Sequence, residues 1–113
     1  MGTRAQVFIK DTGVYLYQHW EGNNLANTVK EAISRGERLD DVEYLTRIIF
    51  SEMIKDSIGD STGYGIGTKQ HSDIEYLITI DCERQIMSVL MYFENTINVI
   101  SFEEILKGEV PVS

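Results

Sequence analysis

The hydrophobic pattern of this 113-residue chain changes from extended to helical and back, and this change limits the possible folds most strongly. Residues 3–10 and 14–20 are two β-rich runs, and Gly13 between them can supply the positive φ of a tight hairpin turn. Apolar residues then recur at helical spacing, before extended runs return near residue 64. Helices grouped between strands that tight turns join are typical of an α+β fold.

Residues 23–36 predict a short amphipathic helix. Its core-facing stripe consists of apolar residues at helical spacing: Leu25, Val29, Ala32 and Ile33. Asn23 or Asn24 precedes this stripe as the expected N-cap, and Gly36 lies beyond the C-terminal end.

Residues 40–59 predict a second and stronger helix. Asp40 and Glu43 have the spacing of a capping box, and apolar residues continue at helical period as far as Met53. Gly59 is expected to end this helix.

The second half of the chain returns to strands. Residues 64–68 and 73–81 are extended, and residues 82–85 turn the chain. Residues 86–93 are apolar enough to predict a central strand that is covered on both faces. Residues 97–108 predict a short strand and then a helical turn, with a serine cap and a glutamate at capping-box spacing.

The order of elements is therefore ββααβββ followed by a short C-terminal helix. We expect a mostly antiparallel sheet with the two central helices packed on one face. The length suits a single domain of residues 1–113, with a loose tail at residues 108–113.

Alternation along each predicted strand separates a core face from a second face. The second face would display an unusual number of aromatic side chains: Phe8, Tyr15, Tyr17 and Tyr92. Contiguous aromatic surface is costly to expose, so we expect a second copy of the chain or a ligand to cover it. A strand register that differs from the expected one is the remaining alternative.

The formal net charge of −8, from 18 acidic and 10 basic residues, predicts no direct contact with duplex nucleic acid. The carboxylates serve either solubility or the mimicry of nucleic acid against a basic partner. No apolar stretch approaches the roughly 20 residues of a membrane span, and the N-terminus lacks a signal-peptide core. A single cysteine, Cys82, suits a reducing compartment, so we expect a cytoplasmic protein without membrane contact.

Residues 63–69, GYGIGTK, allow interpretation as a phosphate-binding loop, because glycine amides can cradle an anion. The run matches neither G-x-x-x-x-G-K-[ST] nor G-x-G-x-x-G, and no helix is predicted after it. The alternative is a bulge or a close strand approach at the edge of the sheet.

Two histidines stand in polar surroundings. His71 shares a predicted strand face with Asp73 and Glu75, a donor set that suits zinc or manganese. Same-face ligands on one strand lie about 6 to 7 Å apart, however, and seldom converge on one ion. His19 and Trp20 could donate to a phosphate and stack on a base. Neither a Ser-His-Asp nor a Cys-His pattern is present, so we expect no enzymatic activity, cofactor or metal.

Two parts of the chain together resemble a group of small bacterial and phage proteins. The matching stretches are MGTRAQVFI with YLYQHWEG, and YGIGT with HSDIEYLITID, roughly half of the chain by pattern. That group begins Met-Gly-Thr-Arg and usually has Tyr-Pro where Asn23 and Asn24 follow Gly22 here. The resemblance implies a common fold and an origin in a phage or mobile element, and no reaction. Small acidic phage proteins often act in counter-defence, by sequestering nucleotide signals or by occluding a defence protein.

We therefore expect a non-enzymatic, homo-oligomeric protein that binds a small anionic, nucleotide-like ligand. Its expected binding residues are Arg4, His19, Trp20, Tyr64, Gly65, Gly67, Thr68 and His71. Arg4 would pair with a phosphate and the histidines would donate hydrogen bonds. The ring of Trp20 or Tyr64 would stack on a base, and amides around Gly65 and Gly67 would complete a cradle.

Two alternatives remain open from the sequence. The first is an acidic inhibitor of a basic partner, whose surface would consist of carboxylates around the two helices: Glu31, Glu37, Asp40, Asp41, Glu43, Glu52 and Asp56. The second is a small metal-dependent hydrolase that uses His71, Asp73 and Glu75.

Overall fold

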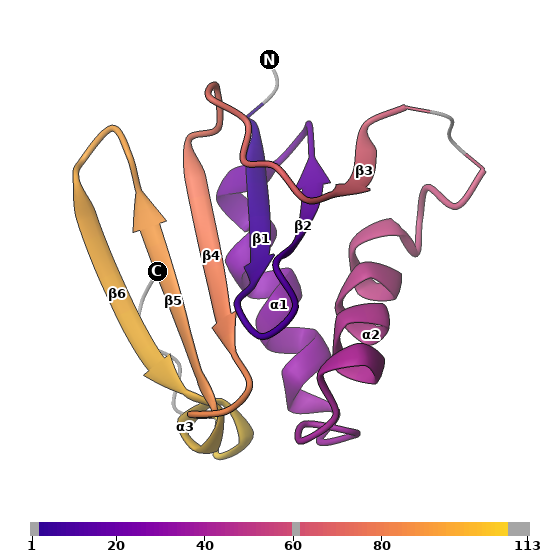
Figure 1. Ribbon diagram of the computed structural model, residues 1–113, viewed down its shortest axis with the longest axis vertical. Helices are drawn as coiled ribbons and strands as arrows, with labels where there is room; N and C mark the ends of the chain where they lie inside the picture. Colours follow the sequence, from indigo (N-terminus) through magenta and orange to yellow (C-terminus); the bar gives the residue numbers. More distant parts are fainter. Residues whose placement is uncertain (1–2, 60–61, 109–113) are drawn as a thin grey trace.

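A computed structural model describes residues 3–59 and 62–108 and contains one mixed β-sheet (Figure 1). Its strands are β1 (Ala5–Ile9), β2 (Val14–Gln18), β3 (Tyr64–Gly67), β4 (Tyr76–Asp81), β5 (Ile86–Met91) and β6 (Thr96–Ser101). Their order in space is β3-β2-β1-β4-β5-β6, and every neighbouring pair is antiparallel except β1 and β4. A parallel pair needs a long connection to return the chain, and here that connection contains both long helices.

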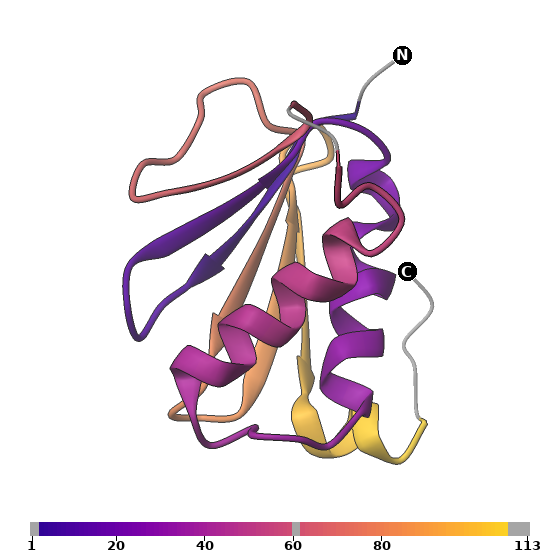
Figure 2. The ribbon, with the colours of Figure 1, turned by 90° about the vertical axis from the view of Figure 1, so that its right-hand side faces the viewer.

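The helices cover one face of the sheet (Figure 2). They are α1 (Leu25–Ser34), preceded by the 3-10 turn η1 (Gly22–Asn24), α2 (Val42–Ile54) and the short α3 (Phe102–Leu106). The predicted α+β class and order of elements are confirmed. The extended region after α2 divides into two strands that are not neighbours, because β3 pairs with β2 whereas β4 pairs with β1.

The hydrophobic core lies between the helices and the sheet. Alternate residues of β1, which are Ala5, Val7 and Ile9, are almost completely buried there, as the strand period predicts. The predicted stripe of α1 is completely buried as well. The capping box that begins α3 is present, since Ser101 Oγ accepts from the Glu104 amide and the Glu104 carboxylate accepts from the Ser101 amide.

The opposite face carries no helix among the described residues, and we call it the open face. Every strand except β3 contributes side chains to this face, because the β3 residues on it are glycines. The contributing residues are Gln6, Phe8, Tyr15, Tyr17, Leu77, Thr79, Ile86, Ser88, Leu90, Ile97 and Val99. The rings of Phe8 and Tyr15 stack on it with their centroids 4.6 Å apart. The aromatic character predicted for this face is therefore present.

Several predicted boundaries are wrong. The cap of α2 is Asp41, whose extended backbone lets its carboxylate accept from the Tyr44 amide, and not Asp40. The helix ends at Ile54 rather than near Gly59. β5 lies one strand in from the edge, but of its residues only Met87, on the helix side, is buried, and its open-face side chains are half-buried in the described structure.

The predicted tail falls mostly on residues 109–113, which lie outside the described residues. Within residues 3–59 and 62–108, no helix is both long enough and apolar enough to span a membrane.

Candidate functional site

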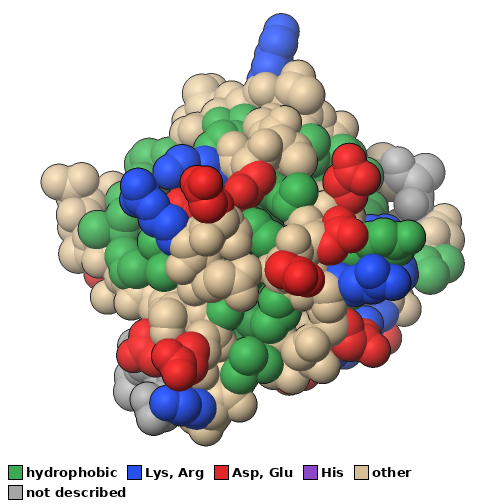
Figure 3. Space-filling model, turned by 60° about the horizontal axis from the view of Figure 1, so that its bottom comes forward, with side chains coloured by type: hydrophobic (Ala, Val, Ile, Leu, Met, Phe, Trp, Pro, Cys, Tyr) green, Lys and Arg blue, Asp and Glu red, His purple; other side chains and the backbone are tan. Residues whose placement is uncertain are grey.

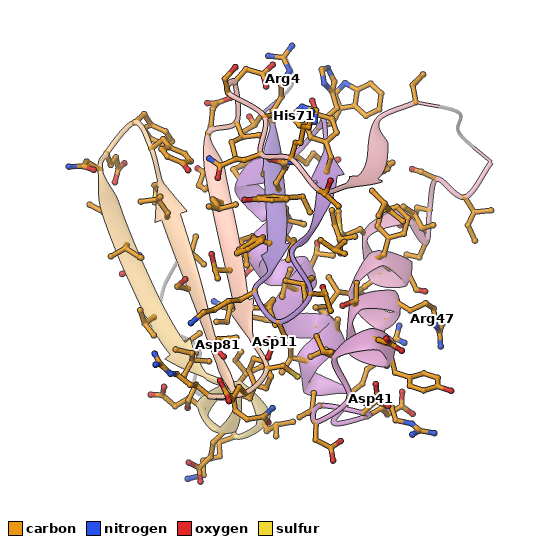
Figure 4. The ribbon with its side chains drawn as sticks, viewed as in Figure 1. Arg4, Asp11, Asp41, Arg47, His71 and Asp81 are labelled. Carbon is orange, nitrogen blue, oxygen red and sulfur yellow. The ribbon has the colours of Figure 1, made fainter. Side chains whose placement is uncertain are left out.

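Polar and aromatic side chains gather at the upper end of the open face, where β1 begins and β2 ends (Figure 4). We call Arg4, Tyr17, His19, His71 and Asp73 the Arg4–His71 cluster. The register explains why residues so distant in sequence meet. Ala5 pairs with Gln18 of β2 and with Tyr76 of β4, so the residues just outside these strands are brought together.

His19 is the centre of the hydrogen bonds in this cluster. Its Nδ1 accepts from Arg4 Nε at 3.3 Å and lies 3.1 Å from the Tyr17 hydroxyl. Because the arginine N–H can only donate, Nδ1 is the acceptor and the neutral ring carries its proton on Nε2. His19 therefore has an N–H donor on the side of the ring away from Arg4.

The Arg4 guanidinium is held loosely. Its Nε lies 3.5 Å from Asp73 Oδ2, and both side chains are about half exposed, so this ion pair is weak. Among the described residues its two Nη groups form no hydrogen bond. Figure 4 shows the side chain extending above the sheet with His71 beside it. Four N–H bonds in the geometry that matches a phosphate or carboxylate are thus available to an anion.

Aromatic rings adjoin the charged groups. Tyr17 and His71 are stacked, with their centroids 4.5 Å apart and an interplanar angle of 19°. The Trp20 ring meets His19 edge-on at 5.0 Å and is 44% exposed, so this tryptophan is not a core anchor. It packs over Gly63, where an added Cβ would lie 2.1 Å from Trp20 Cζ3. A flat surface is therefore exposed next to an arginine, as in sites that stack a base beside a phosphate.

Gln6 fastens the loop of residues 68–75 to the sheet. It is 1% exposed in β1, donates from Nε2 to the Lys69 carbonyl at 3.2 Å and accepts at Oε1 from the His71 amide at 2.9 Å. Both ends of one buried amide thus fix the loop that carries His71 and Asp73. Sequence reasoning missed Gln6 as a site residue, although a glutamine inside an apolar strand is a signal for such a role.

The two glycines of the predicted anion cradle lie in strand β3. Gly65 and Gly67 pair with Tyr17 and Tyr15. His19 donates to the Gly63 carbonyl, and antiparallel pairs alternate, so the amides of Gly65 and Gly67 also face β2. These amides belong to the sheet, and no anion cradle forms at them. Thr68 is exposed at the start of the loop.

Tyr64 is separated from the cluster, because it points to the helix side of the sheet. There it lines a cleft of about 550 Å³ between α1, α2 and the β2–β3 edge, which we call the acidic cleft. Among the described residues that line it, the carboxylates are Glu21, Glu31, Glu52 and Asp56, and Lys55 is the one cation. The hydrogen bond from Lys55 Nζ lowers the pKa of Glu52, against the opposing effect of burial and with further help from Arg35.

The lower end of the molecule has a third group of acidic side chains (Figure 4). Asp11 accepts from the Cys82 amide at 2.9 Å, and Asp81 accepts from the Arg84 amide at 3.1 Å and from Lys10 Nζ at 3.3 Å. These carboxylates stabilise the turn between β4 and β5 by accepting hydrogen bonds from its backbone amides. Acidic and basic side chains are scattered over this end, between hydrophobic and other side chains (Figure 3).

No group of three or more His, Cys, Asp or Glu side chains among the described residues is arranged to hold a metal ion. His71, Asp73 and Glu75 precede β4 instead of sharing one strand face, because the strand begins at Tyr76. The geometry that the hydrolase alternative requires is therefore not found there.

No protein-family model, curated protein or solved structure matches the chain.

Proposed function

We propose that this is a non-enzymatic binding protein that holds a small anionic, nucleotide-like ligand at the Arg4–His71 cluster. The observation that supports this most is the arginine itself. It is oriented through Nε, and its Nη groups form no hydrogen bond with the described part of the chain, beside stacked aromatic rings. A phosphate at this position would take the place of the Asp73 carboxylate, which is a weak partner on a half-exposed side chain.

The neighbouring groups supply the rest of a recognition site. His19 Nε2–H would donate a second hydrogen bond to the phosphate, and the exposed face of Trp20 or the edge of the Tyr17–His71 pair would contact a base. Among the described residues, the ring of His19 hydrogen-bonds with Arg4 and Tyr17, and no serine, threonine or cysteine side chain contacts it in this way. Binding and sequestration therefore suit the site better than turnover, and a role in counter-defence would follow from the resemblance to phage proteins.

A second candidate, an acidic inhibitor of a basic protein, is supported by the acidic cleft and the exposed carboxylates of α1 and α2. The two proposals place the partner on opposite sides of the sheet and require opposite charge in it. Substitutions in one region should consequently leave the other activity intact.

The test is to recover the ligand and locate its contact. Purified protein is mixed with a nucleotide-rich bacterial extract, washed and heat-denatured, and the released small molecules are identified by mass spectrometry. We expect a phosphorylated compound in stoichiometric amount, and its loss by more than tenfold with Arg4→Ala, since a charge-assisted pair contributes roughly 1.5–3 kcal/mol.

Arg47→Ala is the matched control, because Arg47 is an exposed arginine of α2 far from the cluster (Figure 4). It should retain the compound. An empty release from extracts of both uninfected and phage-challenged cells, or equal loss with both variants, would contradict the proposal.

A further inference from the structure

β6 is an edge strand without the features that usually protect such edges. In the described part of the chain no strand pairs with its outer side (Figure 1). Its six residues, Thr96–Ser101, include no charged residue and no proline, and four of them are exposed. Ile97 and Val99 are 61% and 59% exposed on the open face. Natural sheets normally place lysine, proline or a bulge on such a strand to prevent pairing with another chain.

The hydrogen bonds of the β5–β6 pair show which backbone groups face outward. Phe102 donates to the Gln85 carbonyl at 2.8 Å, one step beyond the paired residues Ser101 and Ile86. Since hydrogen-bonded pairs alternate in an antiparallel ladder, the even-numbered residues of β6 bond to β5. The backbone groups of Ile97 and Val99 therefore point away from the sheet.

The capping box sets the limit of this open edge. The Ser101 amide would be the next to face outward, but it donates to Glu104 Oε1 at 2.9 Å. The available donors and acceptors thus belong to two residues, Ile97 and Val99. They lie symmetrically about Asn98, and this is the arrangement that an antiparallel copy of the same strand can match.

We propose that β6 pairs antiparallel with β6 of a second copy, about a two-fold axis at Asn98. Ile97 of each copy then forms a hydrogen-bonded pair with Val99 of the other, and the two sheets join into one. These side chains project on the open face, so each exposed isoleucine packs against a valine across the axis. The two Asn98 side chains meet at the axis on the helix side, where their amides can hydrogen-bond reciprocally.

The charge and size of this edge favour a second copy as the occupant. Copies with a formal charge of −8 repel one another over most of their surface, whereas the paired stretch is neutral. An interface formed by one short edge strand lies at the low end of the size range of specific interfaces. We therefore expect a reversible dimer with a dissociation constant in the micromolar range.

The opposite edge fits this role less well. β3 has four residues, two of them glycines, and short glycine-rich strands fix their register weakly. Its exposed isoleucine, Ile66, provides a matched control because it is 65% exposed on the other edge of the same sheet.

The first test is sedimentation equilibrium of the full chain from about 1 to 500 μM, without added ligand. Wild-type protein should shift from monomer to dimer over this range. Val99→Lys should raise the dissociation constant at least about tenfold, because it places a charge beside the apolar pair at the axis. Ile66→Lys should dimerise like the wild type, and circular dichroism checks that both variants fold.

A cross-linking test fixes the register. Directly opposed residues in a non-hydrogen-bonded pair have Cα atoms about 4.5 Å apart, within reach of a disulfide, so Asn98→Cys should form a covalent dimer on mild oxidation. Thr96→Cys should not, because residue 96 lies opposite residue 100 of the partner and about 13 Å along the strand from its own copy. Cys82 is buried and present in both variants.

Any of three results would overturn this proposal. They are a wild-type protein that stays monomeric at the highest concentration, a dissociation constant that Val99→Lys leaves unchanged, and cross-linking at position 96 and not at 98. Protection of the Ile97 and Val99 amides from hydrogen exchange at every concentration would also contradict it, since another part of the chain would then cover the edge. None of these measurements involves the Arg4–His71 cluster, so the ligand proposal stands or fails separately.

Discussion

The Arg4–His71 cluster and the acidic cleft lie on opposite sides of the same strand and have opposite chemistry. In β2, Tyr17 faces the cluster and its neighbour Gln18 faces the cleft. Gln18 is buried and donates to the carbonyls of Trp20 and Glu21 at 2.7 and 3.3 Å, which fixes the chain as it leaves the strand. Strand alternation thus separates a cation-bearing site from a carboxylate-lined one. The net charge of a chain does not determine the charge of each of its sites.

The largest expected effect concerns stability on the cleft side. Glu52 is 7% exposed, and its carboxylate binds both Arg35 and Lys55. We expect Glu52→Ala to lower the free energy of unfolding by about 2 kcal/mol, less than for a fully buried pair because both cations can regain water. Urea denaturation measures this change. Ligand binding by the folded variant at the Arg4–His71 cluster should be unaffected.

The pH dependence of the same group gives an independent readout. The pKa of Glu52 lies below its ordinary value of 4.5 in the folded protein. The carboxylate therefore stabilises the fold above that value, and this contribution disappears as the pH falls through the folded-state pKa. Glu52→Ala should weaken the pH dependence of the free energy of unfolding below about pH 4.5. Glu103 is the control, because it forms an exposed ion pair with Lys107, and Glu103→Ala should change the free energy of unfolding by less than about 0.5 kcal/mol. Equal effects of the two variants would contradict a structural role for Glu52.

An intermediate effect is expected where the cluster meets the loop before β3. Gly63 has a φ of +95°, and a Cβ there would overlap the Trp20 ring. We expect Gly63→Ala to cost about 1–2 kcal/mol of stability and to displace Trp20, with a shift in tryptophan fluorescence and weaker ligand binding. Gly59→Ala is the control, because a Cβ there meets nothing within 4 Å and its φ is ordinary. Unchanged fluorescence in Gly63→Ala would show that Trp20 does not depend on this contact.

The smallest expected effect is a gain in affinity. If Asp73 occupies the place of an anion, Asp73→Asn should tighten binding of adenosine monophosphate about two- to five-fold, because the competing carboxylate is lost. Glu75→Gln makes the same change in net charge two residues away and should have less effect. Titration calorimetry compares the two variants. Weaker binding in Asp73→Asn would indicate that Asp73 positions Arg4 and does not compete for it.

Local patterns predicted the hairpin, the helix stripes and the aromatic open face, because strand and helix periods depend on neighbouring residues. Arg4 and His19 could be linked in advance, since the hairpin turn at Gly13 brings them together. The placement of His71 beside Tyr17 could not, because it depends on Gln6 binding a loop more than sixty positions further along the chain.

The errors have the same origin. Asp40 and Asp41 are equally good caps by composition, and the choice of Asp41 depends on the path of the loop that precedes α2. Tyr64 and Gly65 were predicted in one site, but adjacent strand residues point to opposite faces of a sheet. Gly65 is therefore on the same face as Tyr17, whereas Tyr64 is on the helix side with Gln18. The parallel pairing of β1 with β4 is likewise a long-range choice that no local pattern encodes.

The most direct test of the central claim is to map where an anion binds. Backbone amide chemical shifts of the isotope-labelled protein are followed during titration with millimolar adenosine monophosphate, at fixed ionic strength. We predict shifts at Arg4, His19 and residues 68–75, and none at Glu31 or Asp56 of the acidic cleft. Shifts confined to the cleft, or no shifts at the Arg4–His71 cluster at saturating ligand, would contradict the account.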